Sequence, residues 1–171
     1  LNGGTDSVYL GYLAGGVGTI TGNDNVVVGR QAAEDATAMN QSVIIGSGAS
    51  KAGVNAAAGN VVIGYNAGND LTSGGSNILI GSSAGANVDT GNNNVAIGDN
   101  AFGSSDSAEL SNIAIGTNAL GAETTGAEYC VAVGHNALAS QNADVKNTAI
   151  GGLAGDNIDS GTGNTIVGYL A

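Results

Sequence analysis

The side chains that could carry out acid–base, nucleophilic or metal chemistry are few in this chain. It has one histidine, His135, and one cysteine, Cys130, five residues apart. A single histidine cannot supply a typical zinc site, and no serine or cysteine stands with it in the pattern of an activated nucleophile. His135 follows a glycine that recurs along the chain, and the same position elsewhere holds Tyr65, Asp99 or Gly152, which is typical of a solvated bend. We expect no catalytic role for His135 and a small, buried, unreactive Cys130.

Carboxylates are the other groups that could do chemistry. The chain has 14 acidic residues. Most of the aspartates lie between apolar segments: Asp24, Asp35, Asp70, Asp89, Asp106, Asp144, Asp156 and Asp159. A calcium ion needs about six oxygen ligands, and Gly15–Thr19 begins like a calcium-binding glycine repeat but lacks its aspartate. Carboxylate pairs for glycoside hydrolysis need a fixed separation in a cleft. We interpret these residues as solvated acidic loops, leave a calcium site open, and predict no metal, no cofactor and no enzymatic activity.

The net charge excludes one class of partner. Three basic against 14 acidic residues give a formal charge of −11, and such a surface repels phosphate backbones. Arg30, Lys51 and Lys146 are too far apart in the sequence to form a basic stripe. No apolar run approaches the roughly 20 residues of a membrane-spanning helix. We therefore predict no nucleic-acid partner and no membrane insertion by this segment.

An internal repeat covers the whole chain and indicates its architecture. The unit is asparagine, three apolar residues, glycine, two variable residues and alanine, as in Asn94–Ala101. Its anchor glycines follow one another at intervals of 17 or 18 residues: Gly11, Gly29, Gly46, Gly64, Gly81, Gly98, Gly116, Gly134, Gly151 and Gly168. Seven copies have asparagine four residues before the anchor: Asn25, Asn60, Asn77, Asn94, Asn112, Asn147 and Asn164. Ser7, Ser42 and Cys130 take this position in the others. Stacked asparagines can form a hydrogen-bonded ladder or cap the bend before a strand.

The repeat predicts an all-β, parallel β-solenoid or β-roll of ten coils that forms one segment, residues 1–171, of a longer fibrous protein. Three aliphatic residues favour a short strand, and the following glycine permits a bend. Apolar residues such as Leu71, Val88 and Ile158, followed by pairs such as Ser73-Gly74, suggest a second short strand in each coil. Strands stack about 4.8 Å apart, so ten coils would make a rod of roughly 48 Å. The 31 glycines argue against a helical array, because each costs about 1 kcal/mol in a helix.

Alternation along the strand predicts which side chains face inward. We assign the first and third strand residues, such as Val95 and Ile97, to the inside, and the middle residue, such as Ala96, to the outside. The middle residue is never charged, so an apolar stripe would run along the rod and need a cover. Identical chains around an axis would cover it, and the assembly would narrow where the middle residue is alanine, in the sixth to ninth coils. A wider monomeric solenoid that buries both faces is the alternative.

The repeat resembles two groups of known proteins. The motif in Asn94–Ala101 resembles the head repeats of trimeric autotransporter adhesins of bacteria, which are left-handed parallel β-rolls of three chains that bind host surfaces or matrix proteins. Copies such as Asn60–Gly68, followed by Thr72–Asn77, look like the repeat regions of phage tail fibres. The coils look longer than those of the adhesin heads, which favours the phage-fibre type. The resemblance implies a left-handed homotrimer.

The resulting hypothesis is a structural segment, shaft or head, of an extracellular homotrimeric fibre that holds or forms an attachment device, as on a virion tail. The first alternative is the head of a bacterial adhesin on the cell surface, which would bind a receptor, glycan or matrix protein through exposed residues such as Tyr12, Tyr65 and Tyr169. A remote alternative is an ice-binding solenoid, which needs a regular threonine array that this chain lacks.

Overall fold

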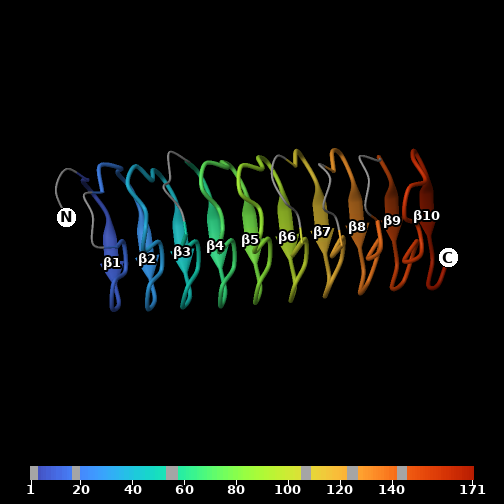
Figure 1. Ribbon diagram of the computed structural model, residues 1–171, viewed down its shortest axis with the longest axis horizontal. Helices are drawn as coiled ribbons and strands as arrows, with labels where there is room; N and C mark the ends of the chain where they lie inside the picture. Colours follow the sequence, from blue (N-terminus) through green and yellow to red (C-terminus); the bar gives the residue numbers. More distant parts are fainter. Residues whose placement is uncertain (1–3, 17–19, 53–57, 105–108, 123–126, 142–145) are drawn as a thin grey trace.

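A computed structural model describes residues 4–16, 20–52, 58–104, 109–122, 127–141 and 146–171. It contains ten three-residue strands: β1 (Val8–Leu10), β2 (Val26–Val28), β3 (Val43–Ile45), β4 (Val61–Ile63), β5 (Ile78–Ile80), β6 (Val95–Ile97), β7 (Ile113–Ile115), β8 (Val131–Val133), β9 (Thr148–Ile150) and β10 (Thr165–Val167). Figure 1 shows them side by side in chain order along the long axis, with the two termini at opposite ends. We number the coils by the strand that each contains.

All ten strands belong to one parallel sheet. The strand order is the chain order, and every pair is in register, as where Val43, Ile44 and Ile45 align with Val61, Val62 and Ile63. Each position of the repeat therefore forms a column along the rod. No helix occurs in the described residues. The predicted all-β, parallel solenoid is confirmed.

The anchor glycine is required by both its backbone angle and its close neighbour. In all ten coils its φ lies between 128° and 145°, a region that side chains disfavour. From Gly11 to Gly151, a Cβ on the anchor would also overlap the carbonyl group of the next anchor along the rod. The backbones of successive coils touch at this column, which explains why glycine occupies it in every copy.

The predicted second strand is wrong. Leu71, Val88 and Ile158 lie in turns, where each N–H donates to the carbonyl three residues earlier, at Gly68, Gly85 and Gly155. Left-handed residues stand two positions after the anchor in all ten coils and four positions after it in nine. These residues turn the chain too sharply for a second extended strand after the anchor. Outside the ten strands, the described residues contain only isolated bridges, such as Asn92 with Leu110, and these lie shortly before the next strand. Thr125 and Gly126, one of the pairs that suggested this strand, lie outside the described residues.

The core is a narrow column inside the coils. It contains the middle residue of each strand and the alanine three residues after the anchor. Where they are apolar, the residues four and seven after the anchor also belong to it, as Phe102 and Leu71 do. The middle residue is buried in β2 to β9 and partly buried in β1 and β10. Ala96 and Ala101, for example, are both fully buried. The sequence-based assignment of the two strand faces is therefore reversed: the middle residue points inward and its two neighbours point outward.

Side-chain sizes at two core positions compensate for each other. Leu79, a large middle residue, faces Gly85, where a Cβ would lie 2.7 Å from the leucine Cδ2. In coil 6 the middle residue is Ala96, and the residue four after the anchor is the fully buried Phe102. Coils 7 and 8 have the same arrangement as coil 6. Their middle strand residue is alanine, and the residue four after the anchor is the buried Leu120 or Leu138. The alanines of coils 6 to 8 thus make room for inner side chains. In coil 9, Ala149 is also buried and the residue four after the anchor is Gly155, which Ile166 and Leu138 of the neighbouring coils approach instead. None of the four alanines lies on the outer face, so the predicted narrowing there is wrong.

Candidate functional site: the outer face of the sheet

The outer face of the sheet is an apolar surface along the whole rod. It consists of two columns, the first and third residues of each strand, and none of these residues is buried in the single chain. Eighteen of the twenty are valine, isoleucine or leucine, and the other two are Thr148 and Thr165. Ile78, in the middle of the rod, is 38% exposed and Ile150 is 44% exposed. An exposed aliphatic surface of this length is typical of a face that another molecule covers.

The face that lies outside is more apolar than the face that the sequence placed there. The face predicted to lie outside carried one apolar residue in each coil, several of them alanine. The face that does lie outside carries two, and β-branched residues predominate on it. Since the inside of each coil is filled by one strand residue and the turn residues after the anchor, no room remains there for the other two.

The repeat asparagines form a ladder inside the coils, at the start of each strand. Asn77 shows the pattern. Its Oδ1 accepts a hydrogen bond from the N–H of Asn94 in the next coil at 2.9 Å, and its Nδ2 donates to the carbonyl of Gly91 at 2.8 Å. Direct contacts between the amides are rarer, as between Asn112 and Asn94. Ser42 replaces half of this function, because its Oγ accepts the N–H of Asn60. The ladder joins each coil to the next and closes its own turn.

Removing one rung of this ladder should be costly. In Asn77→Ala, the N–H of Asn94 and the carbonyl of Gly91 lose their buried partner, which should lower the free energy of unfolding by about 2–4 kcal/mol. Asn77→Ser is the matched control, since it keeps an acceptor for the N–H as Ser42 does, and it should lose about half as much. Urea unfolding followed by circular dichroism measures both. Equal stability of the alanine variant and the wild type would contradict the role assigned to the ladder.

Cys130 interrupts the ladder, and Gln141 completes it. The cysteine is buried, as expected, and its N–H still donates to Asn112 Oδ1. The buried Gln141 amide donates to the Cys130 sulfur and accepts a hydrogen bond from Asn147 Nδ2 at 3.0 Å. Gln141 stands where other coils have Leu71 or Val88. A polar residue in this apolar core position is explained by the shorter side chain at position 130.

Two columns of exposed or partly exposed residues border the outer face, one at each end of the strands. The leading rim is the residue five before each anchor: Asp6, Asp24, Gln41, Gly59, Ser76, Asn93, Ser111, Tyr129, Lys146 and Gly163. The trailing rim is the residue directly after each anchor: Tyr12, Arg30, Ser47, Tyr65, Ser82, Asp99, Thr117, His135, Gly152 and Tyr169.

The three tyrosines considered as surface contacts all lie on the trailing rim. Tyr12, Tyr65 and Tyr169 are 70%, 62% and 74% exposed. They belong to coils 1, 4 and 10, so they share a column but lie roughly 14 Å and 29 Å apart along the rod at the usual strand spacing. The structure does not bring them together into one aromatic patch. His135 is exposed on the same rim, as a solvated bend requires.

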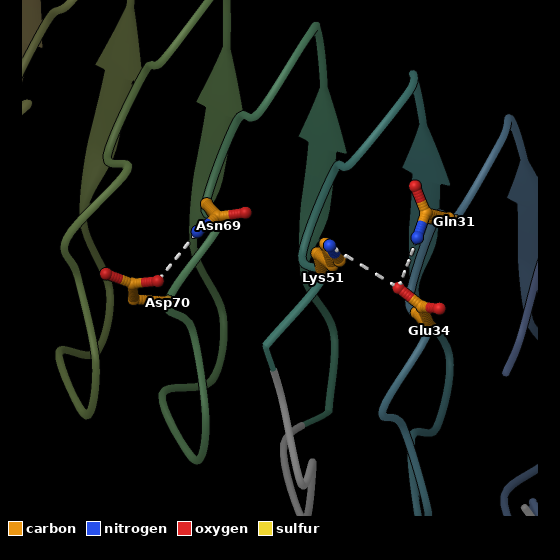
Figure 2. A network of polar contacts seen from close by, with 5 residues as sticks. All are labelled: Gln31, Glu34, Lys51, Asn69 and Asp70. Carbon is orange, nitrogen blue, oxygen red and sulfur yellow. Dashed lines mark hydrogen bonds and ion pairs between the residues drawn. The ribbon is translucent and has the colours of Figure 1, made fainter.

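Charged side chains lie mainly on the turns after the anchor, away from the sheet. Figure 2 shows five polar residues of coils 2 to 4. Glu34 accepts a hydrogen bond from Gln31 at 2.9 Å and pairs with Lys51 at 3.6 Å, and Asn69 donates to Asp70 at 2.7 Å. Lys51 is 43% exposed, so this ion pair contributes little to stability. The ion pair joins two neighbouring turns, and the two hydrogen bonds lie within one turn each, so these contacts form no binding site.

Other kinds of site are scarce in the described residues. No group of three or more histidine, cysteine, aspartate or glutamate side chains there could hold a metal ion. Asp106 and Asp144, two of the loop aspartates, lie outside that part of the chain. A cavity of about 360 Å³ lies at the end of coil 10, lined by residues that include Ile158, Ile166 and Leu170. The described residues also contain no helix that is long and apolar enough to cross a bilayer.

Comparison with known proteins identifies no relative of this chain. No protein-family model matches it, and neither a curated protein nor a solved structure gives a significant match. The outer face, its rims and the repeat are therefore the features that bear on function.

Proposed function

We propose that this chain is a structural segment, shaft or head, of an extracellular homotrimeric fibre that holds or forms an attachment device, such as a virion tail fibre. The observation that carries the proposal is the outer face, which presents two aliphatic columns over ten coils without one charged residue. Three copies that share this face around a common axis would bury it. Burial of each valine or isoleucine would contribute about 1.5–3 kcal/mol at most. The sequence resemblance to trimeric, left-handed fibre repeats supports the same arrangement.

A non-enzymatic, mechanical role suits this architecture. Glycine and asparagine columns fix each coil to the next, so the rod resists bending and unfolding along its length. The alternative, an adhesive head on a bacterial surface, would use the exposed Tyr12, Tyr65 and Tyr169 to bind a glycan or a matrix protein. Their separation along the rod favours the shaft. Deleting internal coils from the full fibre tests this point: a shaft would shorten while attachment persists, whereas an adhesive head would lose attachment.

A charge on the outer face should separate the copies and leave the coil folded. We expect the wild-type chain to have three times its 16.3 kDa mass in solution, and Ile80→Asp to have the mass of one chain with an unchanged β-type circular dichroism spectrum. The side chain of Ile80 points out of the coil, so the substitution leaves the core intact. Asn87→Asp, on an exposed turn, is the matched control and should keep the wild-type mass. Light scattering measures both. A stable wild-type monomer would refute the homotrimer.

A further inference from the structure

The two rims of the outer face cannot contact each other within one chain. In every coil the strand and one residue at each end of it separate the leading rim from the trailing rim. The six residue steps between the two rims, at strand-like rise, hold them roughly 15–20 Å apart. Any fit between residues of the two rims at the same level must therefore concern a second copy of the chain.

Residues at the same level of the two rims are complementary in size in three coils. In coil 4, Tyr65 on the trailing rim corresponds to Gly59 on the leading rim, and in coil 10 Tyr169 corresponds to Gly163. Coil 9 reverses this pattern, with Lys146 on the leading rim and Gly152 on the trailing rim. In these three coils a large residue corresponds to a glycine, whereas coil 8 has a large residue on each rim, Tyr129 and His135.

Charge follows the same rule in coil 2. Asp24 lies on its leading rim and Arg30 on its trailing rim, and both are exposed. Within the described residues the structure gives one ion pair, between Lys51 and Glu34, so Arg30 has no carboxylate partner there. No coil has two like charges on its rims. In coil 1, Asp6 lies on the leading rim and Tyr12 on the trailing rim, and the tyrosine hydroxyl can donate a hydrogen bond to a carboxylate.

We infer that copies of this chain associate side by side, parallel and in register, with the leading rim of each copy against the trailing rim of the next. In this arrangement Arg30 pairs with the partner's Asp24, and the rings of Tyr65 and Tyr169 cover the partner's Gly59 and Gly163. The inference rests on the proposed homotrimer and deepens it, because it fixes the direction, register and rim contacts of the copies. It also gives the exposed tyrosines a role between copies.

The ring of Tyr169 adds a contact at coil 9. A Cβ on Gly152 would lie 3.5 Å from the Tyr169 ring, so this ring lies over the glycine of the preceding coil. The partner's Lys146, at the level of Gly152, would meet that ring in a cation–π contact.

An antiparallel arrangement would instead place coil 1 of one copy beside coil 10 of the other. It would bring Tyr12 against the partner's Tyr169 and Asp24 against the partner's Lys146.

Engineered thiols distinguish these arrangements. Ser76→Cys with Ser82→Cys, in a Cys130→Ser background, places one thiol on each rim of coil 5, where both native side chains are small hydroxyls. Oxidation, or a short bismaleimide, should link most chains into covalent oligomers of the native size on a non-reducing gel. Ser76→Cys with Thr117→Cys is two coils out of register and should link at least fivefold less. Asp24→Cys with Lys146→Cys reports an antiparallel pair and should not link.

The outcomes separate this inference from the proposed function. Oligomers that link only through the out-of-register or antiparallel pairs, or through none of the three, would overturn the inference and leave the assembly standing. A monomer under all conditions would overturn both. As a second measurement, Arg30→Asp should weaken assembly by several-fold to roughly tenfold, because it sets two carboxylates against each other. Adding Asp24→Arg should restore it. Equal assembly of the single and double variants would also contradict the inference.

Discussion

Gly98→Ala is expected to abolish the native fold across coils 6 and 7. The φ of Gly98 is 138°, and an added Cβ would lie 2.6 Å from the carbonyl carbon and oxygen of Gly116 in the next coil. Neither backbone can move away, because each is held in the sheet on both sides. We expect a loss of more than about 4 kcal/mol in the free energy of unfolding, a size that single substitutions reach only through such severe mechanisms. Urea unfolding and protease resistance measure it.

Two other glycines separate the overlap from the backbone strain. Gly168 has a similar φ of 136°, but a Cβ there would meet only the Cβ of Ala171, at 3.4 Å. Gly163 has a φ of 69° and open space around it. In the chain of residues 1–171, Gly163→Ala should cost about 1–2 kcal/mol, and Gly168→Ala should cost more than this but far less than Gly98→Ala. If all three variants lost the same stability, contact between successive backbones could not be the reason for the repeat.

The length of one coil could be predicted from the sequence, because equivalent residues of successive coils stack in a column and therefore recur at a regular interval. Each anchor glycine lies against the next, so its spacing of 17 or 18 residues is the length of one coil. The course of the chain between anchors was less accessible. Leu71 and Val88 look like strand residues by composition, but they lie in local turns that follow left-handed Gly68 and Gly85. Residue type indicates a left-handed φ only weakly, so these turns were not predicted.

The direction of the strand side chains was predicted wrongly because hydrophobicity does not distinguish the two faces. Both faces of β5 and β6 are entirely aliphatic, since one is covered by the coil and the other lies on the outer surface. The sizes of the side chains indicate the inward-facing position better than their hydrophobicity does. Leu79 occurs with Gly85 and Ala96 with Phe102, and only two positions that share one limited volume need such compensation. The pairing of Cys130 with Gln141 is a second signal of the same kind, since both depart from the repeat in one coil.

This compensation predicts a strong coupling between two positions in coil 6. Phe102→Gly alone should remove about 3–5 kcal/mol from the free energy of unfolding, because it leaves a ring-sized cavity in a buried column. Ala96→Leu alone should cost about 1–3 kcal/mol, because the larger side chain must compete with Phe102 for space. The double variant reproduces the Leu79 and Gly85 arrangement of coil 5, so the introduced leucine can fill the volume that the ring vacates.

We therefore expect the double variant to lose less stability than Phe102→Gly alone, with a coupling energy of about 1–3 kcal/mol in a double-mutant cycle. Ile97→Leu combined with Phe102→Gly is the matched control. Position 97 faces outward, so its substitution should add to the effect of Phe102→Gly without coupling. Additive losses for positions 96 and 102 would show that they do not share a volume. Restored stability would mean that the boundary between the two core arrangements can be moved by one coil, since in coils 5 to 8 the middle residue and the residue four after the anchor fill the same space.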